Sequence, residues 1–446
     1  MKYLFSFFLS LFDKTDQKRI FKNFLAEINA NFLRTLIQIG FPPLMIFSYG
    51  LEKFGIWVFI LSIPSILSIL NVNLNEAAKI EMSVNYNLNN YEKINITYNN
   101  TIIFTFIIIL FLSLVSFGVI LNYNFDLKIF EIISPDLNLI LFFIFSAFLI
   151  DFLNSIFICG LTYFGRIDIN SYLEIFFDFL GKILIIIFGF LFGDLLFASM
   201  LYCANSLIKI ITYFYFFKKK NYNVIFLDLS LFSKTEIFRL LKLSFPHYLE
   251  TIIFIVRNSF QIILLGIFFN AYIVGMISAL KTLFFFLPIR AWGILSKVLI
   301  YEFTKSLSSK NVVLLRKMLG KVLIIFLIFV SSYFFISATF GNWLFNFWLN
   351  NSYNYDYYLV LFICLDVSFL VLGSTYKLIG KSINKFSSIV QFDFLISFTI
   401  IALTYFYLKN FESLYFLFIM NIIGSIAYLT YSFLNYKKVI KLLKST

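Results

Sequence analysis

The sequence predicts an all-α polytopic membrane protein with about twelve transmembrane helices in two parallel six-helix bundles. Three observations support this fold class. Of the 446 residues, 61% are hydrophobic and 13% are charged, whereas soluble domains are about 45–50% apolar and about 25% charged. Apolar runs long enough to cross a bilayer recur along the whole chain. The two halves of the chain also share one polar motif at the same place.

The composition excludes several classes of protein. A net charge of +13 results from 36 Lys and Arg against 23 Asp and Glu. In a soluble protein this excess would suggest nucleic acid, but here the basic residues are scattered and the polar surface is small. We therefore expect no nucleic-acid partner. A soluble enzyme, a disordered chain and a disulfide scaffold are excluded as well.

The transmembrane helices can be assigned in order along the chain. Each needs about 20 mostly apolar residues, because the hydrocarbon core of a bilayer is about 30 Å thick. The fifth and sixth runs are separated only by Gly189 and Gly193-Asp194, and the longest loops, 76–100 and 218–240, are too short for separate domains. The predicted spans are 22–47, 54–75, 101–121, 137–162, 171–191, 194–217, 241–269, 272–299, 318–340, 356–376, 386–408 and 412–435.

The basic residues predict the orientation of these spans. One side of the predicted topology, which includes both termini, carries 26 Lys and Arg, and the other side carries only Lys53, Lys128 and Lys409. Positive residues collect on the cytoplasmic side of membrane proteins. We therefore expect a multi-pass protein of the bacterial cytoplasmic membrane, with both termini in the cytoplasm. Seven basic residues remain inside the spans.

An internal repeat predicts the domain organisation. The pattern Glu-x6-Arg-x3-Gln occurs in the first span and, 223 positions later, in the seventh, and its three residues lie on one helix face. Each half contains an even number of spans, so the halves have the same orientation. We assign residues 1–217 to an N-terminal lobe, 218–240 to a basic cytoplasmic linker and 241–446 to a C-terminal lobe. The motif residues are Glu27, Arg34 and Gln38, and Glu250, Arg257 and Gln261.

Charges in the membrane are the strongest functional candidates. A charge at the bilayer centre costs at least about 2.5–3.5 kcal/mol, so it usually faces a polar interior or a partner. Arg34, Arg257 and Lys281 lie near mid-depth, and Arg290 lies toward the cytoplasmic side. We expect Lys209 and Lys297, near cytoplasmic helix ends, to extend to the membrane surface.

Two interpretations of these charges remain open. In the first, Glu27 or Glu250 forms an internal salt bridge with the arginine on its own helix, although seven residues is far for direct contact. In the second, the polar stripe, which Asn31 extends on the first span, lines a substrate cavity. The fifth span carries its own row, Glu174, Asp178 and Lys182, in which a local Asp178–Lys182 pair is favoured over a functional role.

A cavity lined by cations suits an anionic ligand. Arginine suits phosphate especially, because its planar guanidinium can hold two oxygens at once. The sequence contains one His and three Cys, with no metal-ligand spacing and no phosphate-binding loop. We therefore expect a protein that is not an enzyme and that needs no cofactor or metal.

Two segments resemble a known family of transporters. The segment LEKFGIWVFILSIPSILSILNVNL at 51–74 resembles the second helix of Wzx-type polysaccharide flippases of the MATE/MOP superfamily. FGNWLFNFWLN at 340–350 resembles their outer loop between helices nine and ten, and 260–283 resembles their seventh and eighth helices. Asn71 and Asn73 stand where that family usually has Asp and Gly, and Gln261 stands near a frequent acidic position.

The resemblance implies a V-shaped pair of six-helix lobes around a cationic cavity. It implies a flippase that moves undecaprenyl-pyrophosphate-linked oligosaccharide from the cytoplasmic to the outer leaflet by alternating access, for O-antigen, capsule or exopolysaccharide synthesis. Arg34, Arg257, Lys281 and Arg290 would bind the pyrophosphate. The remaining residues of the polar stripes would line the cavity, and some would couple transport to an ion as in an antiporter. These residues are Glu27, Asn31, Gln38, Glu250, Gln261, Glu174 and Asp178.

The expected partners and the rival functions follow from this interpretation. We expect lipid-linked oligosaccharide and membrane lipids as ligands, polysaccharide polymerase and chain-length proteins as partners, and a monomeric chain. A MATE-type multidrug exporter and a flippase for peptidoglycan lipid II are alternatives on the same fold. A membrane glycosyltransferase or polymerase would need catalytic residues on a large outer loop, whereas the outer loops here are short.

Overall fold

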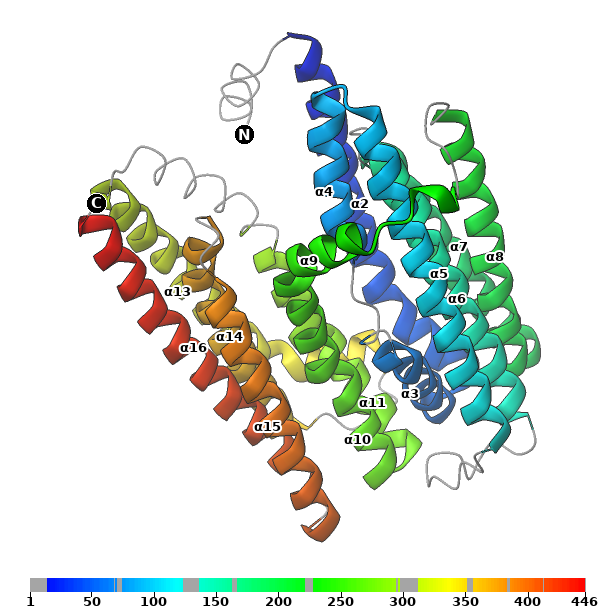
Figure 1. The fold of residues 1–446 in the computed structure, drawn as a ribbon. Coiled ribbons are helices and arrows are strands. Elements are labelled where there is room, and N and C mark those ends of the chain that lie inside the picture. The colour runs from blue at the N-terminus through cyan, green and yellow to red at the C-terminus, as the bar shows by residue number, and fades with distance from the viewer. Residues whose placement is uncertain are drawn as a thin grey trace. The chain divides into compact units, whose positions relative to one another are not determined.

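The computed structural model describes residues 14–67, 69, 74–122, 136–162, 167–220, 228–293, 296, 312–350, 356–382, 386–411 and 413–445. These residues form helices joined by turns, and no strand occurs among them (Figure 1). Contacts divide the chain into two units. Unit 1 holds the described residues up to 245 except those in 51–69, and unit 2 holds the described residues in 51–69 and from 246 onward.

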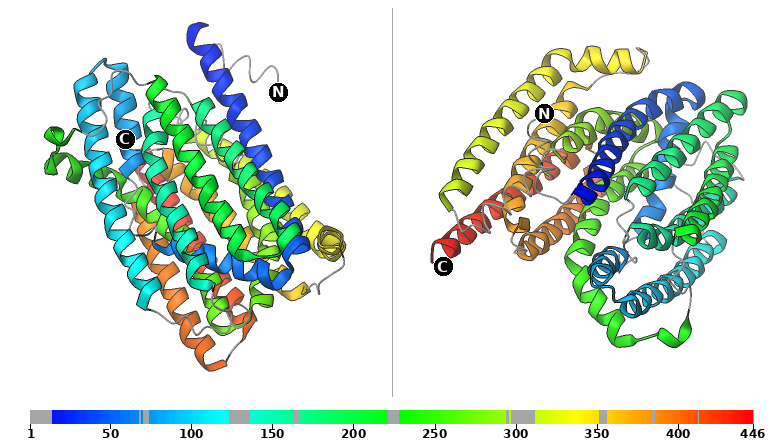
Figure 2. Two further views of the ribbon diagram at one scale, coloured as in Figure 1. Left: turned by 90° about the vertical axis from the view of Figure 1, so that its right-hand side faces the viewer. Right: turned by 90° about the horizontal axis from the view of Figure 1, so that it is seen from above.

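Unit 1 is a bundle of long helices. Helix α6 packs on α8 and α5, and α7 packs on α2 and α8; α5 to α8 run side by side in both views of Figure 2. The elements are α2 (Lys14–Tyr49), α4 (Leu74–Asn87), α5 (Tyr91–Asn122), α6 (Leu137–Thr162), α7 (Ile167–Phe192), α8 (Leu195–Lys220), the short 3₁₀ helix η3 (Leu229–Leu231) and the first turns of α9 (Lys234–Ile255).

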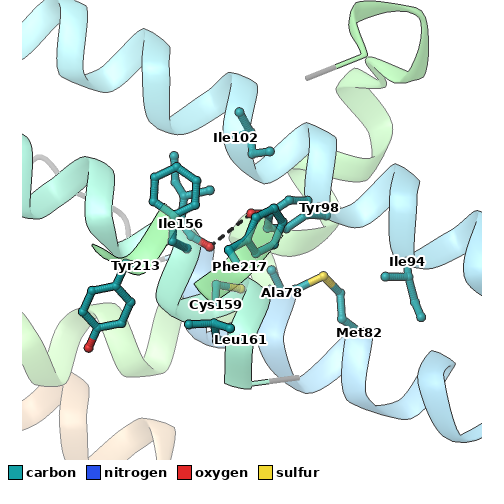
Figure 3. Packing of buried hydrophobic residues seen from close by; sticks show 11 residues of the cluster. Ala78, Met82, Ile94, Tyr98, Ile102, Ile156, Cys159, Leu161, Tyr213 and Phe217 are labelled. Carbon is teal, nitrogen blue, oxygen red and sulfur yellow. Dashed lines mark hydrogen bonds between the residues drawn. The ribbon is translucent and has the colours of Figure 1, made fainter. Parts of the chain in front are cut away.

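The core of unit 1 joins α4, α5, α6 and α8 (Figure 3). The buried ring of Tyr98 stacks on Phe217 with 5.5 Å between ring centroids. Its hydroxyl donates a hydrogen bond of 3.4 Å to the carbonyl oxygen of Ile156. A buried tyrosine needs such a partner, because an unpaired hydroxyl in an apolar environment costs free energy.

The polar and apolar side chains of helix α5 are distributed as in a helix that faces lipid. Thr101 and Thr105 are buried, and each donates a hydrogen bond of 2.8 Å to the carbonyl four residues earlier. Large apolar residues on the same helix, among them Ile107, Leu110 and Leu114, are exposed. This arrangement is unfavourable in water but suits a bilayer, where apolar side chains contact lipid and polar groups must be paired within the protein.

Unit 2 contains the remaining helices. Helix α14 packs on α16 and α13, and α15 packs on α16; these yellow to red helices lie side by side in Figure 2. The elements are α3 (Leu51–Leu67), the rest of α9, the π-helix η4 (Val256–Phe260), α10 (Gln261–Phe268), α11 (Ala271–Lys281), the π-helix η5 (Thr282–Phe286), α13 (Val312–Trp348), α14 (Tyr357–Ser382), α15 (Ser387–Phe411) and α16 (Leu414–Ser445).

Helix α3 belongs to unit 2, although its sequence position is in the first half of the chain. It packs closely on α11, because both helices carry glycine at the contact. A Cβ on Gly55 would lie 2.0 Å from the carbonyl oxygen of Ala271, and a Cβ on Gly275 would lie 2.5 Å from that of Leu51. Only glycine allows the two backbones to approach this closely.

The segment between α8 and α9 is attached to α5 by two asparagines. Asn99 Oδ1 accepts a hydrogen bond of 2.7 Å from the amide of Asp228. Asn100 Oδ1 accepts one of 2.7 Å from the amide of Ser233, and its Nδ2 donates one of 2.8 Å to the carbonyl of Leu231. Part of the predicted basic linker is therefore ordered on unit 1.

An ion-pair cluster completes this attachment. Arg239 on α9 binds Glu81 on α4 and also Glu236, whose Oε1 lies 2.6 Å from Arg239 Nη2. The neighbouring Leu240 is fully buried against Leu74. The hydrogen bond and charge of the Arg239 guanidinium hold the pKa of Glu236 below its usual value.

Where the structure describes them, the predicted spans fall on helices, with differences at the ends. Ten helical segments of the described chain are long and apolar enough to cross a membrane. Helices α2 and α3 are not among the ten; α3 has 17 residues, and α2 contains Pro42 and Pro43 besides its polar side chains. The prediction of a loop over 76–100 was wrong, because hydropathy misses polar helices such as α4 and the start of α5.

Candidate functional site

The arginine of the first span forms an ion pair with the fifth. Arg34 lies on α2, and its guanidinium binds the carboxylate of Glu174 on α7. Both side chains are partly accessible, with exposed fractions of 26% for Arg34 and 33% for Glu174. The sequence selected both residues for separate stripes, and the structure brings them together within unit 1.

The arginine of the seventh span has an equivalent partner in unit 2. Arg257 Nη2 lies 2.5 Å from Asp393 Oδ1, and its Nε donates a hydrogen bond of 3.1 Å to Ser397 Oγ. Both acceptors lie on α15. The guanidinium also lies 5.7 Å from the ring centroid of Tyr428, which adds a cation–π contact.

The two ion pairs repeat the same arrangement in the two halves. In each half of the chain the arginine of the first predicted span binds a carboxylate of the fifth, on α7 for Arg34 and on α15 for Arg257. Sequence reasoning missed Asp393. The repeat could have located Asp393, because it follows Arg257 by 136 positions and Glu174 follows Arg34 by 140. Shared geometry of this kind supports the internal repeat as a structural feature.

Lys281 is held by amide groups. It is buried, and its Nζ donates hydrogen bonds of 3.0 Å to Gln261 Oε1 and 3.5 Å to Asn258 Oδ1. Gln261 Nε2 in turn donates a hydrogen bond of 2.5 Å to Asn421 Oδ1 on α16. The sequence selected Lys281 and Gln261 separately, and here they form one network.

A small polar cavity in unit 2 adjoins this network. It has a volume of about 20 Å³, which is enough for about one water molecule. Arg257 and Gln261 border it, and so does Asp366 on α14, which accepts a hydrogen bond from Ser425. Asp366 was not selected from the sequence, where a single acidic residue in the tenth span has no partner visible nearby.

The two π-helices of the described part of unit 2 lie at these cations. Arg257 is part of η4, and η5 begins immediately after Lys281. A π-helix adds a residue to a turn and rotates the side chains that follow, and such turns are frequent at functional sites. They were not predicted, because no residue pattern in the sequence marks a single π turn.

The other predicted stripe residues divide among several contacts. Lys377 Nζ lies 2.5 Å from Oε1 of Glu250 and binds it from α14. Asn31 accepts a hydrogen bond of 2.7 Å from Thr35 at its backbone carbonyl. Gln38 is half-buried on α2. The side chain of Glu27 lies outside the described residues.

Two of the remaining membrane cations, Lys182 and Lys209, bind carboxylates. Lys182 Nζ lies 2.9 Å from Asp178 Oδ1, which confirms the predicted local pair on α7. Lys209 Nζ lies 3.0 Å from Asp151 Oδ1 on α6. The expectation that Lys209 extends to the membrane surface stays a prediction. Arg290 is half-buried in the helix after η5, and Lys297 lies outside the described residues.

Pairing explains how these charges are tolerated in the membrane. Four of the cations, Arg34, Lys182, Lys209 and Arg257, each bind a carboxylate. An ion pair with added hydrogen bonds removes much of the cost of burying a single charge. Within the described part of the chain, no three His, Cys, Asp or Glu residues are grouped as a metal site would require.

Comparison with known proteins identifies the fold. The sequence matches no protein-family model and no curated protein. Solved structures do match over nearly the whole chain. The inward-facing conformation of a multidrug resistance MATE family transporter of the MOP superfamily is 13% identical, with a TM-score of 0.63 over 94% of this chain and 95% of that chain.

Two further structures show the same likeness. A mutant of the Vibrio cholerae MATE transporter VcmN is 15% identical, with a TM-score of 0.59 over 94% of this chain and 98% of that one. The outward-facing conformation of a multidrug resistance MATE family transporter of the MOP superfamily is 14% identical, with a TM-score of 0.56 over 93% and 97%. The all-helical MATE/MOP fold class predicted from the sequence is thereby confirmed, and the chain is a multi-pass membrane protein.

Proposed function

We propose that this protein is a transporter that works by alternating access and flips undecaprenyl-pyrophosphate-linked oligosaccharide from the cytoplasmic to the outer leaflet. The observation that carries the proposal is the repeated pair, Arg34 with Glu174 and Arg257 with Asp393. A guanidinium at the same position of both halves suits a ligand with several anionic oxygens.

The carboxylates have a role in this proposal when no substrate is bound. An unpaired arginine in the membrane would be costly, and a carboxylate neutralises it. Phosphate oxygens have the same charge and suit the same guanidinium geometry as a carboxylate, so they can replace it. The partial exposure of Arg34 and Glu174 leaves this pair accessible for such an exchange.

The solved structures support the transport part of the proposal. Both an inward-facing and an outward-facing MATE family transporter resemble this chain over nearly its full length. A fold that is known in two such conformations suits a mechanism in which the substrate site opens to each side in turn. Arg290 and Lys281 would bind the pyrophosphate together with the two arginines, and Glu250 would take part in ion coupling.

A multidrug exporter is the second candidate. Each ion pair contains one carboxylate as well as one arginine. Glu174 and Asp393 could therefore attract a cationic drug, which favours an exporter. The structures that resemble this chain are also described as multidrug resistance transporters. A lipid II flippase has the same headgroup chemistry as the first candidate and differs in its sugar.

Binding of ligands to the purified protein distinguishes these candidates. We expect undecaprenyl-pyrophosphate-linked oligosaccharide to displace a fluorescent undecaprenyl pyrophosphate from the detergent-solubilised chain, whereas cationic dyes such as ethidium leave it bound. Displacement by ethidium, or no binding of the pyrophosphate lipid, would favour the multidrug exporter. Stronger displacement by lipid II than by other lipid-linked sugars would favour the peptidoglycan substrate.

A further inference from the structure

The first turns of α9 carry a stripe of four exposed side chains, two phenylalanines and two lysines. The four are Lys234, Phe238, Lys242 and Phe245. Their spacings of four, four and three residues place them on one face of the helix. Phe238 has an exposed fraction of 73%, whereas Leu240, on the other side of the helix, is fully buried. This part of α9 is therefore amphipathic, and its outer face combines apolar rings with positive charge.

Contacts within unit 1 fix these turns at one level of α5. Leu240 packs with Leu74 of α4, and Phe104 of α5 packs against the same cluster. The first turns of α9 run across α4 and α5 rather than along them (Figure 1). Only two residues after Phe104, about 3 Å along the helix, α5 begins to expose large apolar side chains, with Phe106 and Ile107. Because such side chains face lipid, the stripe lies at the edge of the hydrocarbon.

The chain on the other side of this level is polar. Asn99 and Asn100 precede Phe104 on α5 and bind the segment 228–233 through its backbone. Three residues after Phe245, at Tyr248, α9 enters an apolar span. The stripe therefore lies where polar chain gives way to apolar chain on both helices. In the predicted orientation this boundary is the cytoplasmic surface of the membrane, where anionic lipids give a negative surface potential.

We propose that residues 234–245 form an interfacial helix that binds anionic phospholipids of the cytoplasmic leaflet. Phe238 and Phe245 enter the boundary between headgroups and acyl chains, as the apolar side chains of such helices do. Lys234 and Lys242, on the same face, extend their ammonium groups to the lipid phosphates. The positive charge beside the rings and the level of the stripe on α5 select a lipid as the occupant. This role is independent of which substrate the protein moves.

A fluorophore in place of the Phe238 ring tests this placement. The three native cysteines, Cys159, Cys203 and Cys364, are buried, so the introduced thiol of Phe238→Cys can be labelled selectively with an NBD reagent. The full chain is then reconstituted in nanodiscs of phosphatidylglycerol and phosphatidylcholine, with a nitroxide on the acyl chain of one lipid at a time. We expect both lipids to quench the label, and the nitroxide on phosphatidylglycerol to quench it more strongly.

Two controls match the position and the charge. Leu88→Cys carries the same label at an exposed apolar residue between α4 and α5, 16 positions before Phe104, and we expect neither lipid to quench it. In the protein labelled at 238, Lys242→Gln should lower the preference for phosphatidylglycerol by about fivefold, since a lysine near an anionic surface contributes about that factor. Lys409→Gln, at an exposed lysine on α15, should leave the preference unchanged.

Three results would overturn the inference. Absence of quenching at position 238 would place the stripe in water, as a docking site for a soluble protein requires. Equal quenching by the two lipids would show an interfacial helix that does not select anionic headgroups. A preference for phosphatidylglycerol that Lys242→Gln leaves as it is would show that the stripe is not the cause of the preference.

Discussion

Arg257 lies 2.5 Å from Asp393 across two helices of unit 2. The equivalent residues of the first half, Arg34 and Glu174, are paired in unit 1. The repeat therefore preserves an interaction between helices as well as a sequence motif. Since each pair joins an arginine to a carboxylate on another helix, it neutralises the arginine and ties the two helices together.

Removal of one partner of the unit 2 pair should destabilise the protein. Asp393→Ala leaves the largely buried guanidinium of Arg257 beside two neutral groups, Ser397 and the ring of Tyr428. Loss of one member of a fully buried pair costs about 3–5 kcal/mol, which is an upper bound here. We expect a lower Tm in detergent. The double variant Arg257→Leu, Asp393→Leu should recover most of the loss, and Glu52→Ala, at an exposed carboxylate, should leave Tm unchanged. A Tm in Asp393→Ala equal to that of the wild type would contradict the importance of the pair.

The contact of α3 with α11 should depend on glycine. In Gly55→Ala the Cβ would lie 2.0 Å from the carbonyl oxygen of Ala271, and overpacking of this kind costs about 1–3 kcal/mol. Gly118→Ala adds the same atom in open space and should be neutral or stabilising. Thermal unfolding of the two variants measures the difference. If Gly55→Ala is as stable as Gly118→Ala, the helices do not approach this closely.

The segment 228–233 should detach when Asn100 is replaced. Asn100→Ala removes the acceptor of the Ser233 amide and the donor to the Leu231 carbonyl. We expect faster cleavage of this segment in limited proteolysis. Asn410→Ala, at an exposed asparagine on α15, is the control. Equal cleavage rates in wild type and Asn100→Ala would show that the asparagine does not hold the segment.

The cluster around Arg239 should stabilise the protein in a pH-dependent manner. The pKa of Glu236 is lowered by Arg239, so its contribution is present above the ordinary glutamate pKa of about 4.3 and is lost as the pH falls through the lowered value. Glu236→Gln should therefore lower Tm at pH 7, and the difference from wild type should shrink below about pH 4. Glu92→Gln, at an exposed position, serves as control. A Tm difference that grows on acidification would contradict the assignment.

Much of the fold could be predicted from the sequence. Apolar runs in the sequence locate the ten described helices that are long and apolar enough to cross a membrane, because a helix in lipid must be largely apolar. The polar helix α4 and the attachment through Asn99 and Asn100 could not be predicted, since polar helices and side-chain hydrogen bonds to the backbone leave no hydropathy signal. The inclusion of α3 in unit 2 depends on tertiary contacts at Gly55.

The candidate site was predicted in part. Arg34, Arg257 and Lys281 stand out because cations are rare in apolar helices. Their pairing does not, since Glu174, Asp393 and Gln261 lie on other helices and only the packing brings them together. Glu174 and Gln261 were selected for other reasons, and Asp393 was missed. The interpretation in which Glu250 forms a salt bridge with Arg257 on its own helix was wrong, because the structure pairs Glu250 with Lys377 and Arg257 with Asp393.

The most direct measurement of the central claim is the flipping rate of labelled undecaprenyl-pyrophosphate-linked oligosaccharide in proteoliposomes. The variant to compare with wild type neutralises both pairs at once, with Arg34→Gln, Glu174→Gln, Arg257→Gln and Asp393→Asn, so that no unpaired charge is left in the membrane. We expect flipping at least about tenfold slower in this variant, with Tm retained. Undiminished flipping by a variant that lacks both arginines would contradict the assignment of the pyrophosphate to them.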